Sequence, residues 1–450
     1  MHIKITKNMH EVLLNHLHNG DGLEAISFAL CGRTDDSFLI HQIFNIDYER
    51  CNRTENRVSW ETIDLEKILV KSKEEDLSII KFHSHFIEDS GFSEYDNSSD
   101  KDFFESAFGW NLKSNSHASV IMYPSGNMKG RVISPDLEFE KVKKFSIIGS
   151  DLLIMDIELE IKESLAFDRN SKAFGKRTTD LLHNLKIGVV GCSGTGSPTI
   201  EQLVRLGVGE LILIDPDDLG VENMNRIYGS KMDDAIAGIS KVELLEQHIS
   251  SIGLDTKVSI FKSEFQTDKA AWNKLKTCDF VFGCVDSVLG RHHLNLFCNA
   301  YLIPFIDIGV SLISDDNGEI DSITGNIHYL YPGSCSLMER GVYTSDALEA
   351  ETLKKQSPDE YKDRQRYFKN VDEPSPAVIS VNTLCSSYAV NEFLSRLHPY
   401  RNRDNKYFDT TVISLSEFNV ISNRVENSKL NPFLQLIGLG DSAKIHVGNV

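Results

Sequence analysis

The sequence has no Cys-x-x-Cys pair and no long apolar run. Its eight cysteines are scattered over 450 residues, which fits reduced thiols in a cytoplasm better than a disulfide framework. No run approaches the roughly 20 apolar residues of a membrane span. The first residues, MHIKITKNMHEVLL, lack the apolar stretch and cleavage site of a signal peptide. A cytoplasmic location without membrane attachment is therefore expected.

Basic residues are also scarce. Lys and Arg number 47 against 66 Asp and Glu, which gives a formal charge of −19. Nucleic acids and anionic membranes require a basic face, so neither is expected as a partner. The hydrophobic fraction of 41% and the charged fraction of 25% are those of an ordinary globular protein. The length predicts two or three domains.

The first part of the chain, residues 1–140, has an α+β pattern. Short apolar elements at 23–30 and 37–46 precede expected strands at 77–82 and 118–123, and polar loops separate them. Residues 141–184 are charged and mostly helical in pattern, which predicts a connector followed by an arm.

The third part, residues 185–450, alternates apolar strands with helical segments. This alternation is typical of a parallel, doubly wound sheet, so the whole chain is expected to be α/β. Residues 338–375 lack periodicity and predict a crossover loop. Residues 376–396 predict a helix, and the last 50 residues predict strands and turns.

The segment KFHSHFIEDSGFSEYD places two histidines two residues apart. On a strand His83 and His85 point to the same face, so both can bind one metal ion, and Asp96 follows as a third ligand. Three protein ligands leave a fourth zinc position for water, as a hydrolytic site requires. The spacing alone also fits a polar loop whose histidines form hydrogen bonds.

Together with Ser93, this segment resembles the JAB/JAMM metalloprotease pattern, an upstream Glu followed by HxHx7SxxD. The resemblance implies Glu24 as the general acid/base and Ser93 as a group that stabilises the tetrahedral intermediate. Glu88 and Glu94 are nearby alternatives to Glu24. Phe86 stands where the family often has proline. Family members cleave peptide or isopeptide bonds at the C-terminus of ubiquitin-like proteins, or small amides.

A Gly-rich turn joins a strand to a helix at Ile187–Leu206 and contains Gly191, Gly194 and Gly196. Glycines let the backbone approach a phosphate, and the helix N-terminus offers free N–H groups and the positive end of its dipole. Ser193 stands where a simple dinucleotide fingerprint has glycine, which disfavours an NAD oxidoreductase.

Polar side chains follow this turn in a distinctive order. They are Asp215 and Asp217 at the end of the next strand, Asn223, Asn225, Arg226 and Lys241, and later Asp286 with Arg291. An acid at the strand end can bind a ribose hydroxyl. Converging cations suit the attack of a carboxylate on an α-phosphate, because preorganised cations and Mg²⁺ offset the charge that develops there.

Most of residues 165–395 resembles the ThiF-type family of ubiquitin-activating-like enzymes, whose motifs occur in the same order. The resemblance implies that Asp215, with Asp217 beside it, binds the ribose of ATP. It implies that Asn223, Arg226 and Lys241 hold the triphosphate and that Asp286 holds Mg²⁺. The segment FDRNSKAFG is similar to the family's N-terminal arm, which makes Arg169 a contributor to a partner subunit's ATP site and the protein a homodimer.

The cysteines depart from the family pattern. Many relatives hold a structural zinc with two Cys-x-x-Cys pairs, but here Met338 stands at the second position after Cys335, so no second zinc is expected. Cys335 is also the one cysteine placed to form a thioester; a small residue packed in a turn is an equal alternative. Cys385, Cys192, Cys278, Cys284 and Cys298 are interpreted as packing residues.

Both resemblances imply the same substrate class. The expected protein is a bifunctional enzyme, an adenylyltransferase that activates a ubiquitin-like protein with ATP and Mg²⁺ and a zinc peptidase that deconjugates or matures such a protein. The implied partners are a ubiquitin-like or sulfur-carrier protein and a conjugating enzyme. Two alternatives stay open: activation of a sulfur carrier for cofactor or metabolite synthesis, and a non-catalytic nucleotide-binding scaffold.

Overall fold

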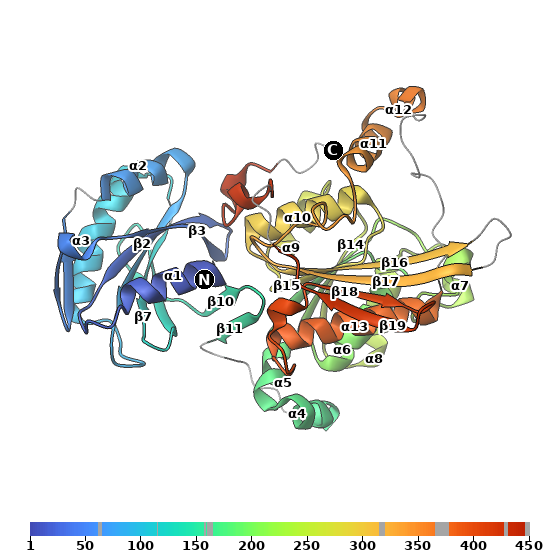
Figure 1. The fold of residues 1–450 in the computed structure, drawn as a ribbon, viewed down its shortest axis with the longest axis horizontal. Helices are drawn as coiled ribbons and strands as arrows, with labels where there is room; N and C mark the ends of the chain where they lie inside the picture. Colours follow the sequence, from blue (N-terminus) through green and yellow to red (C-terminus); the bar gives the residue numbers. More distant parts are fainter. Residues whose placement is uncertain are drawn as a thin grey trace. The chain divides into compact units, whose positions relative to one another are not determined.

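A computed structural model describes residues 1–61, 65–114, 116–156, 159, 165–314, 320–364, 378–426 and 431–445. The chain forms two compact units (Figure 1). The first contains Met1–Glu158, Asn299–Leu302 and Gln435–Ile445, and the second contains Leu159–Cys298 and Ile303–Leu434. Among the described residues, no helix combines the length and the apolar character needed to cross a membrane.

The first unit is built on a nine-stranded mixed sheet with the order β11-β10-β1-β3-β2-β6-β7-β8-β9. Its strands are β1 (His2–Thr6), β2 (Ile26–Arg33), β3 (Ser37–Asn45), β6 (Ser78–Ser84), β7 (His117–Met122), β8 (Met128–Ile133), β9 (Phe139–Lys141), β10 (Lys144–Ile148) and β11 (Leu152–Asp156). Three helices pack on it, α1 (Lys7–Leu17), α2 (Glu66–Glu75) and α3 (Glu94–Trp110). A separate hairpin is formed by β4 (Cys51–Thr54) and β5 (Arg57–Trp60).

Both faces of this sheet are covered, which explains the apolar run in β2. Successive residues of a strand point to opposite faces. Accordingly, Ala29 packs in one core with Leu13 of α1, and its neighbour Phe28 packs in another core with Phe104 of α3. The first unit is therefore a three-layer arrangement with α1 on one face and α2 and α3 on the other.

Strands β10 and β11 correct the expected helical connector after residue 140. β10 pairs in parallel with β1 and antiparallel with β11, so the first unit continues to Glu158. The partner of β10 is the N-terminal strand, a pairing that the local sequence pattern does not indicate. Among the described residues after β11, the first helical turn is Leu165–Phe167, and α4 (Asp168–Phe174) and α5 (Lys176–His183) follow it.

The second unit contains an eight-stranded sheet with the order β14-β13-β12-β15-β16-β17-β18-β19. The strands are β12 (Lys186–Val190), β13 (Glu210–Ile214), β14 (Lys257–Phe261), β15 (Phe280–Gly283), β16 (Phe305–Ser314), β17 (Ile320–Leu330), β18 (Thr410–Ser414) and β19 (Asn419–Asn423). The first five strands in sequence are parallel, as expected, and β17, β18 and β19 add an antiparallel extension.

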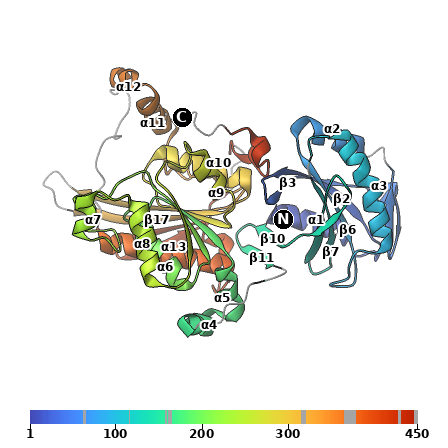
Figure 2. The same ribbon diagram turned by 180° about the vertical axis from the view of Figure 1, so that it is seen from behind.

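The second unit also contains the helices that follow β12. They are α6 (Gly196–Leu206), α7 (Met232–Ala237), α8 (Lys241–Ile252), α9 (Lys269–Leu275), α10 (Val288–Tyr301), α11 (Ser345–Gln356), α12 (Pro358–Arg364) and α13 (Ile379–Leu397). Figures 1 and 2 show α6, α8 and α13 on one face and α9 and α10 on the other.

Helices α11 and α12 correct the expected crossover loop at 338–375. Thr344 caps α11, because its side chain accepts a hydrogen bond from the Ala347 N–H at 3.2 Å. The remainder of that expected loop, residues 365–375, lies outside the described residues. α13 agrees with the helix expected at 376–396, and β18 and β19 agree with strands near the end of the chain.

The C-terminal segment Gln435–Ile445 belongs to the first unit, although the sequence pattern assigned it to the domain at 185–450. The Gly32 N–H donates to the Gly438 carbonyl oxygen at 2.9 Å. The Ser442 hydroxyl donates to the carbonyl oxygen of Asp76, which follows α2, at 3.0 Å. These non-local backbone contacts have no signature in the local sequence.

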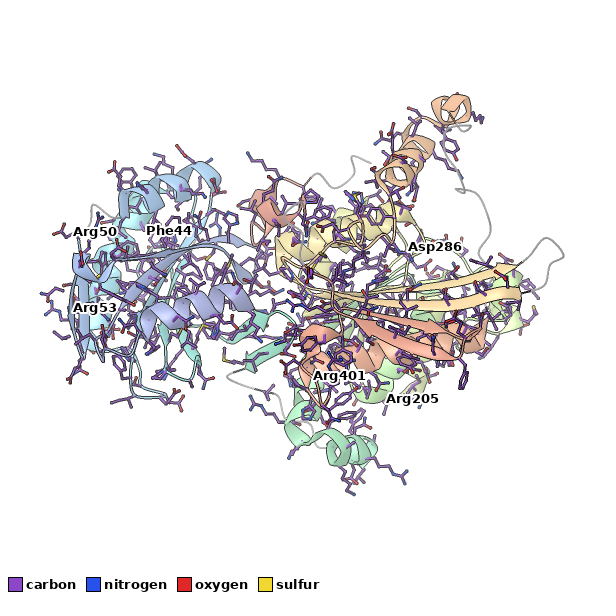
Figure 3. All side chains as sticks on the ribbon, in the orientation of Figure 1. Phe44, Arg50, Arg53, Arg205, Asp286 and Arg401 are labelled. Carbon is purple, nitrogen blue, oxygen red and sulfur yellow. The ribbon has the colours of Figure 1, made fainter. Side chains whose placement is uncertain are left out.

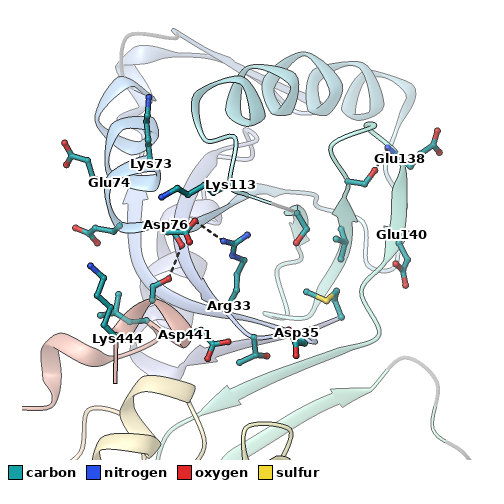
Figure 4. Close-up of a pocket in the computed structure, with 18 of the residues that line it drawn as sticks. Arg33, Asp35, Lys73, Glu74, Asp76, Lys113, Glu138, Glu140, Asp441 and Lys444 are labelled. Carbon is teal, nitrogen blue, oxygen red and sulfur yellow. Dashed lines mark hydrogen bonds and ion pairs between the residues drawn. The ribbon is translucent and has the colours of Figure 1, made fainter. Parts of the chain in front are cut away.

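A cavity of about 1020 Å³ lies beside this C-terminal segment in the first unit. Figure 4 shows Arg33 and Asp76 paired at its wall, with Asp441 and Lys444 from the segment nearby. The wall carries acidic and basic side chains together, so its charge favours no single class of ligand.

We expect Gly32→Ala to release the C-terminal segment. A Cβ atom at residue 32 would lie 2.2 Å from the carbonyl carbon of Leu439, and overpacking of this kind costs about 1–3 kcal/mol. Thermal unfolding and limited proteolysis of the C-terminus measure the effect. The control is Gly109→Ala in α3, where a Cβ meets nothing within 4 Å; alanine there gains about 1 kcal/mol of helix propensity. Equal melting temperatures and equal proteolysis for the two variants would contradict the contact.

Candidate functional site

Two histidines and one aspartate converge beside the end of β6. The Nε2 atoms of His83 and His85 are 3.2 Å apart. Asp96 Oδ1 lies 3.2 Å from His83 Nε2, and Asp96 Oδ2 lies 3.6 Å from His85 Nε2. One ligand atom from each residue lies within 4.8 Å of the others. Two imidazole nitrogens and a carboxylate are a donor set that fits zinc.

The two histidine rings are prepared for such a role in different ways. His85 Nδ1 lies 2.9 Å from Ser90 Oγ, which leaves Nε2 facing the cluster. The Ser90 carbonyl oxygen in turn accepts a hydrogen bond from the Tyr123 hydroxyl. Partners of this kind fix the ring orientation of metal-binding histidines. Burial lowers the pKa of His83, which favours the neutral ring that metal binding requires.

The first turn of α3 holds Asp96 toward the histidines. The Ser93 N–H donates to Asp96 Oδ2 at 2.7 Å and the Asp96 N–H donates to Ser93 Oγ at 3.2 Å, which forms a capping box. The Ser93 hydroxyl also donates to Asp96 Oδ2 at 2.7 Å. Burial alone would raise the pKa of Asp96, but hydrogen bonds from His83 and His85 hold it below its ordinary value. Ser93 therefore positions the carboxylate, a role that the motif did not suggest.

A buried ion network anchors this turn to the sheet. Arg131 donates to the Asp96 carbonyl oxygen at 3.1 Å and to Asp100 Oδ2 at 2.6 Å. Lys81 pairs with the same Asp100 carboxylate. All three charged side chains of the network are buried. Removing one partner from such a network leaves an uncompensated buried charge and costs about 3–5 kcal/mol, so the position of Asp96 is strongly fixed.

Glu24 lies beside the cluster, with Oε1 3.9 Å from His85 Nε2. Burial raises the pKa of Glu24 to about 7, and a carboxyl group that titrates near neutrality can both accept and return a proton. Its backbone is held by Arg53, whose Nε donates to the Glu24 carbonyl oxygen at 2.8 Å. The alternatives lie differently, since Glu88 accepts from the Ser125 N–H at 3.0 Å and Glu94 is exposed.

In the second unit, the carboxyl ends of parallel strands surround a cavity of about 790 Å³. This is where ligands bind in open α/β sheets. Of the residues singled out in the sequence, Gly191, Gly194, Asp215, Asp217, Asn223, Arg226, Lys241, Asp286 and Arg291 line it.

In the Gly-rich turn after β12, Gly191 and Gly196 lie so close to neighbouring backbone atoms that a side chain would not fit. Gly191 has φ +92°, and a Cβ there would lie 2.4 Å from the Cys284 carbonyl oxygen. A Cβ on Gly196 would lie 2.0 Å from the Gly191 carbonyl oxygen. Because α6 begins at Gly196, the turn delivers free backbone N–H groups to the cavity, an arrangement that suits a phosphate.

Asp215 closes β13 and is tied to the turn. Its Oδ2 accepts from the Cys192 N–H at 2.6 Å, and its Oδ1 accepts from the Asp217 N–H at 3.0 Å. Lys241 Nζ lies 2.6 Å from Asp217 Oδ2 and 3.8 Å from Asp215 Oδ1. Burial raises the pKa of Asp215, and Lys241 opposes that rise. The carboxylate and the ammonium group thus share one buried wall of the cavity.

Arg226 is half-buried in another wall. Its Nη1 donates to the Glu222 carbonyl oxygen at 2.7 Å and to Asn225 Oδ1 at 3.1 Å. Asn223 Oδ1 accepts from the Gly220 N–H at 3.0 Å, which stabilises the turn that carries Arg226. Asn225 is exposed and supports Arg226 from outside the cavity lining.

Asp286 and Arg291 complete the cavity after β15. Asp286, labelled in Figure 3, is exposed and lines the cavity. Arg291 from α10 donates through Nε to Asp307 Oδ1 at 3.0 Å. Asp307 is fully buried, and burial raises its pKa while Arg291 opposes the rise. The guanidinium is thus held at the cavity wall by a buried carboxyl group.

Besides Gly196 and Asn225, two further predicted residues lie outside this lining. Arg169 is exposed on α4. Cys335 has an exposed fraction of 3%, and its thiol donates to the Glu426 carbonyl oxygen at 2.9 Å. The cysteine that does line the cavity is Cys284, and burial raises its pKa to about 12. Its thiol is therefore protonated near neutral pH.

Sequence reasoning missed several residues that line the cavity. They are Asn382 on α13, Ile308 and Val310 on β16, and Ser263, Glu264, Phe265 and Gln266 after β14. The one signal for Asn382 in the sequence was its position as a polar residue near the start of the helix expected at 376–396. The others lie on β16 or in the loop after β14, and their local sequence carries no sign of a ligand.

Comparison with known proteins bears on the same region. The ThiF family matches residues 167–432. Ubiquitin-like modifier-activating enzyme 5 of Xenopus laevis is 26% identical over 245 residues, which are 51% of this chain and 59% of that protein. The same enzyme of Aedes aegypti is 30% identical over 184 residues, 38% and 43% of the two chains. The chain thus spans about half the length of the curated relatives it matches.

Two solved structures show a weak similarity to the chain. Escherichia coli MccB with MccA-N7isoASN is 16% identical, with a TM-score of 0.46 over 91% of this chain and 99% of that chain. Escherichia coli tRNA N6-threonylcarbamoyladenosine dehydratase, TcdA, is 21% identical, with a TM-score of 0.39 over 53% and 96%. The family match covers more than half of the 450 residues and contains the whole cavity lining. The chain belongs to the ThiF family.

Proposed function

We propose that the second unit is an ATP-dependent adenylyltransferase that activates the C-terminal carboxylate of a ubiquitin-like or sulfur-carrier protein. One observation carries the proposal: a single cavity combines a Gly-rich turn, a ribose-type acid at Asp215, two cations at Arg226 and Lys241, and the exposed carboxylate of Asp286. The names of the curated relatives, ubiquitin-like modifier-activating enzymes, support the substrate class.

In the proposed reaction, a carboxylate oxygen of the partner attacks the α-phosphorus of ATP. A bond forms between this oxygen and phosphorus, the bond to pyrophosphate breaks, and an acyl-adenylate remains. Arg226 and Lys241 offset the charge that develops on the phosphates. Asp286 would hold Mg²⁺, which would supply further positive charge, and Asp215 would orient the ribose. Asn223 supports the turn that carries Arg226.

The acceptor of the adenylate is proposed to be a nucleophile of another molecule, a thiol of a conjugating enzyme or sulfide. The buried position of Cys335 outside the cavity lining supports an external acceptor. Arg169, exposed on α4, is proposed to reach the nucleotide site of a second copy in a homodimer.

The first unit is proposed to be a JAB/JAMM-type zinc peptidase acting on the same class of partner. His83, His85 and Asp96 would hold the zinc ion, which supplies Lewis-acid activation of water and of the scissile carbonyl. Glu24 carries the proton between the water and the leaving amine, consistent with its raised pKa. Ser93 fixes Asp96, and its predicted contact with the tetrahedral intermediate belongs to the proposal.

Pyrophosphate exchange with candidate ubiquitin-like proteins tests the adenylation proposal. We expect exchange with the wild type and a loss of at least about 100-fold for Asp286→Asn, because the magnesium ligand is removed. Asp233→Asn on α7, an exposed acid outside the cavity lining, is the control and should retain full exchange. Absence of exchange with every candidate would favour the scaffold alternative.

The variant Cys335→Ser tests whether the adenylate is transferred to Cys335 or to a nucleophile of another molecule. Because Cys335 lies outside the cavity lining, we expect this variant to exchange pyrophosphate as the wild type does. We also expect the wild type to show no thioester-linked partner on a non-reducing gel. A thioester band that Cys335→Ser abolishes would contradict the external acceptor while leaving adenylation intact.

Metal analysis tests the proposed zinc site. We expect one zinc per wild-type chain and, for Asp96→Asn, a zinc affinity lower by more than about 100-fold, because loss of a ligand exceeds the effect of losing a ligand's supporting partner. The control is Asp102→Asn, an exposed acid on the same helix α3. Equal zinc contents in the Asp96 and Asp102 variants would rule out this ligand set.

A further inference from the structure

We propose that the Asn382 side chain of α13 contacts the phosphate chain of bound ATP and tunes the affinity of the cavity for it. This inference rests on the proposed adenylation function, and it assigns a role to a residue that no motif in the sequence indicates. Asn382 lines the cavity and has an exposed fraction of only 3%.

The position of Asn382 depends on the Gly-rich turn. A Cβ atom on Gly194 would lie 2.4 Å from Asn382 Nδ2 and 3.5 Å from Arg226 Cδ. The missing side chain of Gly194 is therefore what makes room for the Asn382 amide. The Asn382 amide and the Arg226 side chain thus approach the same glycine of the turn, and the turn and the arginine are the two elements proposed to hold the phosphates.

Two neighbours of Asn382 fix α13 against the same turn. The Ser386 hydroxyl donates to the Thr195 carbonyl oxygen at 2.7 Å. The Thr383 hydroxyl lies 3.1 Å from the Tyr228 hydroxyl, and the Tyr228 N–H donates to Ser197 Oγ in the first turn of α6 at 3.2 Å. These hydrogen bonds, one and four residues after Asn382, hold this part of α13 against the turn and α6.

The amide lies where a ligand can reach it. Within the part of the chain that the structure describes, the Asn382 side chain forms no hydrogen bond, and it lines the cavity. A ligand oxygen in the cavity can therefore accept a hydrogen bond from its amide N–H groups.

The neighbours select the kind of acceptor. An asparagine offers two N–H donors without charge. Asn382 adjoins Gly194 of the Gly-rich turn, and the Arg226 side chain approaches the same glycine. Phosphate oxygens accept hydrogen bonds readily and are the ligand groups that the turn and the arginine favour. We therefore assign the contact to the phosphate chain and not to the base, the ribose or the partner's carboxylate.

Nucleotide titration of the intact protein tests the assignment. Asn382→Asp keeps the size of the side chain and replaces the donor with a negative charge. We expect it to weaken binding of Mg·ATP by about tenfold or more and to leave binding of adenosine unchanged. Asn391→Asp, an exposed residue on the same helix α13, is the control and should bind both ligands as the wild type does. AMP and ADP then identify which phosphate is contacted.

Each outcome decides the matter. Equal losses for ATP and adenosine would assign Asn382 a structural role and overturn the proposal, and unchanged ATP affinity would overturn it as well. If Asn382→Asp does not fold, the uncharged variants Asn382→Ala and Asn382→Ser are compared by the same ratio of ATP to adenosine affinity. A wild type that binds no ATP would reject the proposed adenylation function itself, and with it this contact.

Discussion

The close approach of backbone to backbone at the Gly-rich turn is the constraint on which the second unit depends. Gly191 lies against the Cys284 carbonyl oxygen, and Gly196 lies against the carbonyl oxygen of Gly191. These contacts set where β12, β15 and α6 meet and therefore where the N–H groups of the turn point. The acids and cations around the cavity then take their places relative to that turn, since Asp215 accepts from its second residue and α13 hydrogen-bonds to Thr195.

In the first unit, buried charged groups position the candidate site, whereas glycines do so in the second unit. The site in the first unit is the cluster of His83, His85 and Asp96. Lys81, Asp100 and Arg131 form a buried network that fixes the helix turn carrying Asp96. A buried network of this sort is costly unless each member is satisfied. The position of one carboxylate thus depends on three charged residues outside the motif.

Features that depend on contacts between residues close in sequence could be predicted, and features that depend on contacts between distant residues could not. HxHx7SxxD and the Gly-rich turn are local, so a strand period and a helix cap suffice to bring their residues together. β10 escaped notice because its partner β1 stands at the other end of the first unit's sequence. The position of Asn382 in the cavity lining could not be predicted, because Gly194, the residue that makes room for it, is far away in the chain. The burial of Cys335 is likewise a tertiary property.

Because Gln435–Ile445 belongs to the first unit, that unit cannot be completed until this segment has been synthesised. A ribosome adds about 5–20 residues per second, so the strands of the first unit wait roughly tens of seconds for their last segment. During that time the whole second sheet, through β19, has already been synthesised. The Gly32 N–H at the end of β2 therefore gains its partner, the Gly438 carbonyl oxygen, only after residues 435–445 have been synthesised.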